Sequence, residues 1–573
     1  MKAILNPDSL ARAIAQGRGA QPADVVIKHV GIFHLSTGEL STGDIAICGD
    51  RIVGVGEPYE GVLEIDGAGL TAVPGFIDAH VHVESSMVTP AEFDRMVLPR
   101  GTTTAVCDPH EMSNVCGAAA LDYFLEASRA LCMDLFVDIS SCVPASPFET
   151  SGETLSPDTI RRYADHPRVL GLAELMNVPG VLDGDPGVLA KILAFEGRVD
   201  GHAPSLSGYA LNGYLAAGVR NCHESSTVAE AAEKLRKGMQ ILLRDGSVAH
   251  DLETLHPLLT VANSPFLGFC TDDRTPPDVE QDGHIDGRIA RAIAAGADPL
   301  AAYRAAALSS ARHFRLFDRG LVAPGFLADI VLVSDLRTCA VHTVLKAGRV
   351  VGDALFAARP APPDPSFCRG TLRLRPATAD TFAIRSDRPD TAAIGLVPRH
   401  VATQRLDLPL PPDADGLKHA DPSRDLAKVA VLERHGRNGN IGLGFVHGFG
   451  LARGAIASSV GHDAHNVCVV GVDDASMAAA VNALVEADGG FAVAADGRVS
   501  GLLPLPLAGL FSDRPHEEVS AALRSIHAAA RDLGTPLEAP FHQLAFLPLS
   551  VIPAMRITDK GLFDAEKLAF VAP

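Results

Sequence analysis

The stretch Pro74-Gly75-Phe76-Ile77-Asp78-Ala79-His80-Val81-His82-Val83-Glu84-Ser85-Ser86-Met87 has the pattern of a buried strand that ends in two imidazoles. Residues two apart on a strand project to the same face, so His80 and His82 can reach one metal ion while the neighbouring valines point into the packing. Two histidines on one strand face are also common as ordinary polar residues. A metal site here therefore requires further ligands from elsewhere in the chain.

The size and charge of the chain narrow the class of protein. Its 573 residues are too many for one hydrophobic core, and we expect about three or four folded units. Apolar residues make up 47%, which is typical of a globular protein. The formal net charge of −20 opposes binding to nucleic acid or to an anionic membrane surface, so we expect a small-molecule substrate.

The cysteines and the N-terminal residues allow a prediction of the cellular compartment of the protein. The ten cysteines include no Cys-x-x-Cys pair and lie in apolar runs such as Ala105-Val106-Cys107, which predicts buried thiols in a reducing environment. The first residues, Met1 to Pro7, lack the apolar core of a signal peptide, and no stretch is long enough to cross a bilayer. We expect a soluble cytoplasmic protein.

A small β domain is predicted from two separate segments. Residues 8–16 have the pattern of a short helix, and residues 24–70 contain short apolar runs separated by turn signals such as Ser41-Thr42-Gly43. The same texture returns at residues 329–333 and 344–351. We therefore expect residues 1–72 and 320–357 to build one β domain that the chain leaves and re-enters.

Between these segments, apolar β-branched runs alternate with stretches of helical period such as residues 117–131 and 227–237, the pattern of repeated β-α units. Eight such units predict a (β/α)8 TIM-type barrel over residues 73–319. Ionisable residues stand at the carboxyl ends of the runs, where such a barrel places its chemistry. The expected strand ends are His82, Asp108, Ser140, Glu174, His202, His223, Arg244 and Asp272.

A further domain is expected after the barrel. The Pro-rich run at residues 358–365 has the composition of a linker. Residues 366–573 then show apolar strands such as 467–472 and a helical stretch at 474–487, which predicts a mixed α/β domain. This region has no phosphate-loop signature.

Six residues of metal-ligand type occupy the predicted strand ends. A carboxylate between two cations offsets their repulsion and can bridge them, while neutral imidazoles complete each shell, so Glu174 is the expected bridge. Asp108, His110 and Glu111 are second candidates in a loop over the barrel mouth, although Asp108-Pro109 also has the pattern of a simple turn before a helix. Arg244 is a weaker candidate. The six expected ligands are His80, His82, Glu174, His202, His223 and Asp272.

These residues resemble the amidohydrolase superfamily, whose barrels carry His-x-His on strand one, a bridging carboxyl on strand four, histidines on strands five and six, and Asp on strand eight. More narrowly, the stretch 74–87, Asp108-Pro109-His110-Glu111 and Thr271-Asp272-Asp273 resemble the bacterial adenine deaminases. Gly461-His462-Asp463-Ala464-His465-Asn466 resembles a motif of that family's C-terminal domain. No metal position departs from the family pattern.

The resemblance implies hydrolytic cleavage of a cyclic amidine C–N bond, converting adenine to hypoxanthine and ammonia in purine salvage. It further implies a binuclear centre of divalent ions, manganese or iron, with zinc as an alternative, and we expect a homodimer. Metal ions lower the pKa of bound water from 15.7 towards about 7, and the hydroxide would attack C6 of adenine. Asp272 would accept the proton and pass it to the leaving amine, although Asp273 can exchange roles with it.

Two further groups are expected around the substrate. Residues 80, 82 and 84 would share one strand face, which places Glu84 nearest the mouth, where an acid suits the ring nitrogens of a purine. The segment 458–466, with His462, Asp463 and His465, is more polar than a surface turn requires. We expect it to close over the mouth and exclude water, the alternative being a turn in an accessory or oligomerisation domain.

Two other functions remain open at this level. One is a related enzyme that opens a cyclic amide or acts on another nucleobase. Cyclic amidases often carry a lysine bridge on strand four, where this chain has Glu174. The other is a non-catalytic scaffold on the same barrel, which would be expected to have lost ligands.

Overall fold

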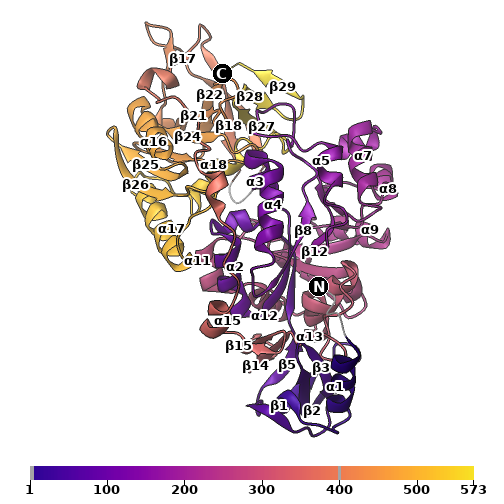
Figure 1. Ribbon diagram of the computed structural model, residues 1–573. Coiled ribbons are helices and arrows are strands. Elements are labelled where there is room, and N and C mark those ends of the chain that lie inside the picture. Colours follow the sequence, from indigo (N-terminus) through magenta and orange to yellow (C-terminus); the bar gives the residue numbers. More distant parts are fainter. Residues whose placement is uncertain (1–5, 398–401, 573) are drawn as a thin grey trace.

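The computed structural model describes residues 6–397 and 402–572, and Figure 1 shows them as three bodies in a row. The sheet with the N-terminal strands lies at one end, the parallel strands with their helices lie in the middle, and the C-terminal sheets lie at the other end. Residues 1–5 of the N-terminal stretch fall outside the described residues. Within those residues no helix combines the length and apolar content needed to span a bilayer. All ten cysteines are free and eight are buried, which confirms the prediction of buried thiols for those eight.

The first body is a sheet built from two distant segments, in the order β16-β15-β14-β5-β1-β2-β3 with β4 on β1. Strand β14 runs antiparallel to β5, and Ile330 pairs with Pro74, so the chain leaves this sheet after β5 and returns at β14. Helix α1 (Pro7–Gly17) begins at Asn6, whose side chain accepts a hydrogen bond from the backbone of Ser9, and this confirms the predicted N-terminal helix. The strands are β1 Ala23–Phe33, β2 Leu40–Cys48, β3 Arg51–Val55, β4 Gly61–Asp66, β5 Thr71–Pro74, β14 Ile330–Val333, β15 Val341–Lys346 and β16 Arg349–Val350.

The middle body contains eight short strands in two parallel sheets, ordered β10-β9-β8-β7-β6 and β11-β12-β13. Isolated parallel bridges join Val81 to Asp272 and Val199 to Val219, at the edges of the two sheets. Every residue of β6 and β7 is buried, as expected for parallel strands covered on both faces. All eight predicted strand ends lie within two residues of the observed ones. The strands are β6 Phe76–Val81, β7 Thr102–Cys107, β8 Asp134–Ile139, β9 Val169–Leu175, β10 Val199–Gly201, β11 Asn221–Cys222, β12 Gln240–Arg244 and β13 Leu267–Cys270.

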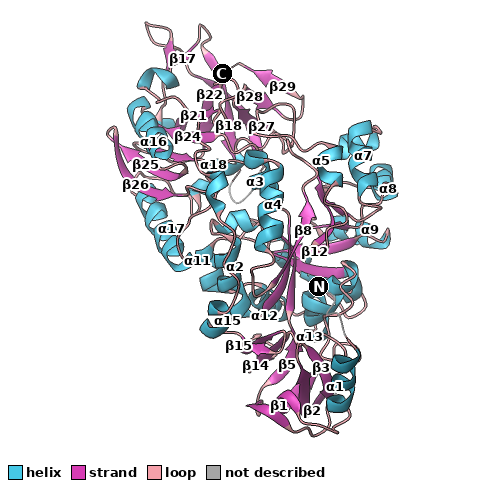
Figure 2. Cartoon of the chain, in the orientation of Figure 1, coloured by secondary structure: helices cyan, strands magenta, loops and turns pink. Residues whose placement is uncertain are grey.

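Helices follow most of these strands and cover them (Figure 2). The predicted helices at 117–131 and 227–237 are α4 and α9; α9 begins where the Thr227 side chain accepts from the Glu230 backbone. The helices are η1 Val83–Ser86, α2 Pro90–Val97, η2 Leu98–Arg100, α3 His110–Cys116, α4 Ala118–Ala127, α5 Pro157–Arg161, α6 Val178–Leu182, α7 Pro186–Ala194, α8 Gly208–Ala216, α9 Val228–Arg236, α10 Asp251–Leu255, η3 His256–Leu258, η4 Ser264–Phe266, α11 Pro276–Asp282, α12 Ile285–Ala294, α13 Pro299–Tyr303, the π-helix η5 Arg304–Ser309 and α14 Ser310–His313.

The third body is centred on an eight-stranded sheet in the order β19-β18-β22-β21-β24-β23-β25-β26. Helix α15 (Asp353–Ala357) and the turn η6 (Pro365–Cys368) bracket the Pro-rich segment, and residues 358–364 have neither helix nor strand. The predicted strand at 467–472 is β24, and the predicted helix at 474–487 is α16. The remaining elements are η7 Ala379–Phe382, β17 Ile384–Arg385, β18 Asp390–Leu396, β19 Thr403–Pro409, β20 Leu417–Lys418, η8 Pro422–Arg424, β21 Leu426–Leu432, β22 Ile441–His447, β23 Ala455–Ser458, β24 Val467–Gly471, α16 Asp474–Glu486, β25 Gly490–Ala495, β26 Arg498–Pro504, α17 His516–Arg531, α18 Pro540–Phe546, β27 Met555–Thr558, β28 Gly561–Asp564 and β29 Ala569–Val571.

The third body packs directly on the loops that follow the parallel strands. The backbone N–H of Ser512 donates to the carbonyl of Met87 at 2.8 Å, and the Thr558 hydroxyl donates to the carbonyl of Phe148 at 2.8 Å. One hydrophobic cluster runs through both bodies and includes Met112 from α3 and Leu547 from the C-terminal region. The C-terminal body therefore covers the end of the parallel strands where the predicted ligands lie.

Candidate metal centre

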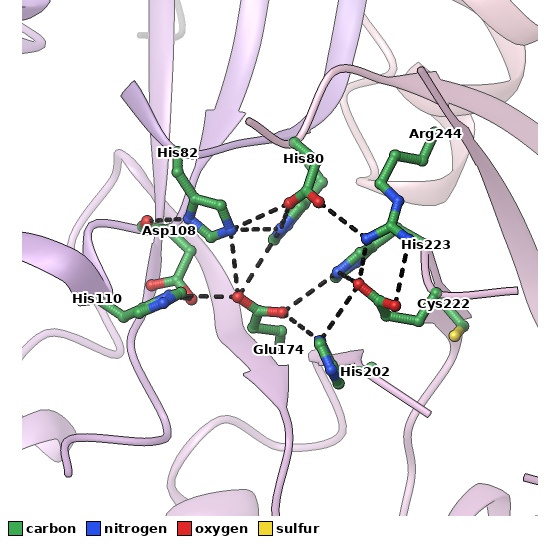
Figure 3. A network of polar contacts seen from close by, with 12 residues as sticks. His80, His82, Asp108, His110, Glu174, His202, Cys222, His223 and Arg244 are labelled. Carbon is green, nitrogen blue, oxygen red and sulfur yellow. Dashed lines mark hydrogen bonds and ion pairs between the residues drawn. The ribbon is translucent and has the colours of Figure 1, made fainter. Parts of the chain in front are cut away.

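The structure brings all six predicted ligands together at the carboxyl ends of the parallel strands (Figure 3). His80 and Glu174 lie in β6 and β9, and the other four lie one or two residues after the ends of β6, β10, β11 and β13. Five are buried and His202 is half-buried. Figure 3 shows Glu174 between two sets of histidines, with one carboxylate oxygen towards each set.

The first set surrounds the Oε1 atom of Glu174. The Nε2 atom of His82 lies 3.3 Å from Glu174 Oε1 and 3.2 Å from Asp272 Oδ1. The Nε2 atom of His80 lies 3.2 Å from His82 Nε2, 3.4 Å from Asp272 Oδ1 and 4.0 Å from Glu174 Oε1. Donor atoms at about 2.1 Å from one tetrahedral cation are about 3.4 Å apart. These four atoms therefore have the spacing of one ligand shell.

The second set surrounds the other oxygen of Glu174. The Nδ1 atom of His202 lies 2.7 Å from Glu174 Oε2, and the Nε2 atom of His223 lies 3.3 Å from it. Glu224, directly after His223, places Oε1 at 3.6 Å from His223 Nε2. The donor set of two imidazoles and carboxylate oxygen suits a divalent ion, so the residues fit two cations with Glu174 shared between them.

Charge in the cluster is balanced by the histidines. Burial alone would raise the pKa of Glu174, but hydrogen bonds from His110, His202 and His223 outweigh burial and hold this pKa well below its usual range. Burial lowers the pKa of His82, yet its hydrogen bonds to the carboxylates of Asp272 and Glu174 hold it well above the usual range. These carboxylates thus stabilise positive charge at the cluster. Histidine protons supply that charge here, and a divalent cation would supply it if it displaced those protons.

Asp272, and not Asp273, faces the histidines. Its backbone lies in the left-handed region with φ 57°, which aspartate tolerates better than most residues. The backbone N–H of Asp272 donates to the carbonyl of His80 at 3.0 Å, and its carbonyl accepts from His82 at 3.0 Å, so it is fixed against β6. The carboxylate of Asp273 instead accepts a hydrogen bond from the Ser85 hydroxyl. Of the two aspartates between which the sequence left the choice open, only Asp272 has its carboxylate next to the histidines.

Asp108 and His110 lie beside the first set. The Nδ1 atom of His110 lies 3.2 Å from Glu174 Oε1 and 3.1 Å from Asp108 Oδ2. The Nδ1 atom of His82 lies 2.9 Å from the carbonyl oxygen of Asp108, and a hydrogen bond there directs Nε2 towards Glu174. Asp108-Pro109 precedes α3, which confirms the predicted turn before a helix, while the functional role of Asp108 and His110 stays a prediction.

The C-terminal segment reaches the same site through Glu111. The Nδ1 atom of His462 lies 2.6 Å from Glu111 Oε1, and His465 Nε2 contacts the other oxygen. The Nε2 atom of His110 lies 3.4 Å from Glu111 Oε1 and 3.8 Å from Asp463 Oδ1. Glu111 and His465 are almost completely buried. The side chain of Glu111 thus connects the polar segment of the third body to His110, which lies beside the metal-ligand cluster.

Comparisons with known proteins identify relatives of both parts of the chain. Residues 71–351 match the amidohydrolase family, and residues 400–569 match the adenine deaminase C-terminal domain. A protein named adenine deaminase from Gluconobacter oxydans is 56% identical over 98% of this chain and 100% of its own length. One of the same name from Methylobacterium nodulans is 55% identical over 98% of this chain and 99% of its own. Among solved structures, molinate hydrolase has a TM-score of 0.44 and 15% identity, covering 60% of this chain and 99% of that chain.

The chain belongs to the adenine deaminase family. It is a member of the amidohydrolase class of hydrolases, whose fold is of the TIM-barrel type, and the resemblance stated from its motifs is confirmed. The part matched to the adenine deaminase C-terminal domain contains His462, Asp463 and His465.

The position of Glu84 in this family member differs from the prediction. Strand β6 ends at Val81, and residues Val83–Ser86 form the 3-10 helix η1, so residues 80, 82 and 84 do not share a strand face. Glu84 is nevertheless buried behind the mouth, where Oε1 accepts from the Met112 backbone at 3.2 Å and Oε2 has no hydrogen-bond partner. Burial raises the pKa of Glu84 to about 8, which makes it a neutral acid at pH 7.

Two residues of the site were missed or undervalued from the sequence. Glu224 follows directly after the expected ligand His223, and that adjacency was the available signal. Arg244 was ranked as weak, yet its Nη1 lies 3.0 Å from Asp272 Oδ2 and it also contacts the Glu224 carboxylate. A half-buried arginine at a strand end becomes recognisable as part of the site only when the three acids that it contacts are seen together.

Proposed function

We propose that this chain hydrolyses adenine to hypoxanthine and ammonia. The observation that carries this proposal is the identity of 55–56% to proteins named adenine deaminase, over nearly the whole of both chains. Such coverage includes the barrel region with its ligand cluster as well as the C-terminal body that contacts it. Glu174 stands where cyclic amidases often have a lysine, which favours the deaminase over that alternative.

We also propose that the two parallel sheets close into one (β/α)8 barrel over residues 73–319. The bridges at Val81 and Val199, which join the sheet edges, support closure. The shared sheet of β5 and β14 supports a β domain from residues 1–72 and 320–357. The eight-stranded sheet after the Pro-rich segment supports a separate α/β domain over residues 366–573.

Two divalent cations are proposed, one held by His80, His82 and Asp272 and the other by His202 and His223, with Glu174 shared. Four imidazoles and two carboxylates suit manganese or iron, with zinc as an alternative. When bound, such ions supply hydroxide near neutral pH by lowering the pKa of water. The site residues for each ion are those whose donor atoms already lie 2.7–4.0 Å from an oxygen of Glu174 or Asp272.

Asp272 is proposed to move the proton. Its Oδ1 faces the histidines, while Oδ2 is held by Arg244 at 3.0 Å, so the carboxylate is fixed in one orientation. Deamination requires a base that accepts a proton from the attacking water and returns it to the nitrogen that leaves from C6. A carboxylate at the edge of the cluster has the geometry for both transfers.

The purine is proposed to lie between the cluster and the C-terminal segment. Glu84 offers a buried carboxyl oxygen without a partner, and Glu111 is fixed by His462 and His465. A neutral acid can donate to a ring nitrogen and a carboxylate can accept from the exocyclic amine, so these two groups would select adenine. The C-terminal segment would exclude bulk water and strengthen these interactions.

The test is ammonia release by the metal-loaded protein against a panel of purines, pyrimidines and cyclic amides. We expect turnover of adenine and little with cyclic amides; activity on cyclic amides alone would overturn the proposal. Glu174→Gln should lose metal and turnover together, whereas Glu39→Gln, at an exposed position between β1 and β2, should retain both. A Glu174→Gln protein with two ions and normal turnover would refute the bridging role.

A further inference from the structure

A second cavity lies at the opposite end of the parallel strands from the metal centre. Its volume is about 370 Å³, and its wall is formed where β9 to β13 begin, by residues such as Gly171, Val199, Gln240 and Phe266. The predicted metal ligands lie where these strands end. The cavity and the proposed active site therefore lie towards opposite ends of these short strands.

Four arginines line this cavity: Arg198, Arg220, Arg312 and Arg315. Within the described residues, none of their guanidinium nitrogens lies within 4.0 Å of a carboxylate oxygen. The Arg198 guanidinium donates to the carbonyls of Phe195, Leu170 and Ala164. Arg220 donates only to carbonyls, while the side chains of Arg312 and Arg315 are exposed at the opening.

This concentration of unpaired cations is unexpected in so acidic a chain. The sequence has 69 acidic against 49 basic residues, so most arginines have a carboxylate available. Arg168 and Arg319, for comparison, contact Asp134 at 2.6 and 2.9 Å. Four cations against two acidic side chains, Asp138 and Asp200, in the wall of one cavity leave an excess of positive charge that attracts an anionic ligand.

Two buried polar atoms in the wall of the cavity also lack partners. The Nε2 atom of Gln240 and the Oδ1 atom of Asp138 have no hydrogen bond, although both side chains are more than nine-tenths buried. Buried polar groups without partners in a cavity wall indicate a ligand that completes their hydrogen bonds.

We propose that this cavity binds a small molecule that carries a phosphate group. Guanidinium groups pair with phosphate oxygens in a planar, two-point geometry, and four of them line the cavity. The cavity volume lies within the range of sites that bind small molecules. It is larger than a phosphate ion alone would fill. Leu170, Phe266 and Phe314 supply an apolar wall for the organic part, and Gln240 supplies a donor at its inner end.

The experiment uses the full-length, metal-loaded protein and three probes: ribose 5-phosphate, inorganic phosphate and ribose. Binding is measured by calorimetry at low and moderate salt. We expect one phosphate-bearing molecule per chain, and no binding of ribose at the same concentrations. Tighter binding of ribose 5-phosphate than of inorganic phosphate would assign the site to an organic phosphate, and the reverse order would assign it to free phosphate.

The matched variants are the triple substitution Arg220→Gln, Arg312→Gln, Arg315→Gln and a control triple that removes Arg369, Arg405 and Arg524, which lie elsewhere on the surface. The first should weaken phosphate binding at least about tenfold, since it removes several charged hydrogen bonds, and the control should not. Both should keep the wild-type kcat/KM for adenine, which shows that they are folded. The single variant Arg315→Glu provides a second test if the triple does not fold.

Three results would overturn the proposal: no binding of either phosphate at about 10 mM, equal binding by the cavity triple and wild type, or equal binding of ribose. The proposal is independent of the deaminase assignment, because it rests on residues at the other end of the strands. If the protein deaminates adenine but does not bind phosphate, only the cavity proposal fails. If it binds phosphate but does not deaminate adenine, only the deaminase assignment fails.

Discussion

Arg244 offers the sharpest test of how the site is organised. It stands at the end of β12, its Nη1 lies 3.0 Å from Asp272 Oδ2, and its Nη2 lies 2.8 Å from Asp251. It also contacts Glu224, and its side chain is only 12% exposed. Arg244→Gln would remove the cation that these three acids share and release one oxygen of the proposed proton carrier.

The expected loss can be worked from these contacts. A hydrogen bond to a charged group contributes about 1.5–3 kcal/mol, and each 1.36 kcal/mol is about tenfold in rate. If the bond to Asp272 acts fully in the transition state, kcat/KM falls by a factor of about 10 to 150. Loss of the cation from buried Asp272 and from partly exposed Glu224 and Asp251 should also destabilise the fold, so unfolding is measured as well.

The assay is the steady-state deamination of adenine with metal content and thermal unfolding measured on the same preparations. Arg244→Lys keeps the charge but not the planar geometry, so its activity should fall between wild type and Arg244→Gln. Arg220→Gln is the control for loss of an arginine away from the metal centre. Wild-type kcat/KM in Arg244→Gln, with both ions bound, would refute the idea that Arg244 positions Asp272.

Three further outcomes are expected. Glu84→Gln should retain two metals and lose at least about tenfold in turnover, since it gives up one hydrogen bond to the purine, and unchanged kinetics with intact metal content would remove Glu84 from the site. Glu111→Gln and His465→Ala break the same contact between α3 and the C-terminal segment, so their effects on kcat/KM should be strongly non-additive in a double-mutant cycle; simple additivity would contradict closure through this pair. Asp134→Asn should destabilise the protein at pH 7, because Lys346 and two arginines outweigh burial and hold the pKa of Asp134 well below its usual range. That stabilisation is present above the unfolded pKa and is lost as pH falls through the lower folded pKa, so the difference from wild type in denaturant unfolding should shrink in acid, and a constant difference would count against it.

Much of the fold was accessible from the sequence because its signals are local. The alternation of apolar β-branched runs with helical spacing predicted all eight parallel strands, and each observed end lies within two residues of the expected one. The polar residue that follows each run marked the ligand positions, since parallel strands deliver their carboxyl ends to one side. The prediction that Glu84 shares a strand face with His80 and His82 was wrong. Alternation of side chains assumes that the strand continues, whereas here the chain forms the helix η1 directly after His82.

The sequence by itself determined the strand ends, the six candidate ligands and the membership in the family, because these depend on residue order and spacing. Only the tertiary structure decided which atoms meet. The left-handed backbone at Asp272, bonded to both sides of His80 and His82, turned that carboxylate and not its neighbour towards the histidines. Folding also brought Arg244 to Asp272 and His465 to Glu111, contacts between residues 28 and 354 positions apart. No local pattern encodes such pairs, since they form only when strands and domains that are distant in sequence pack against each other.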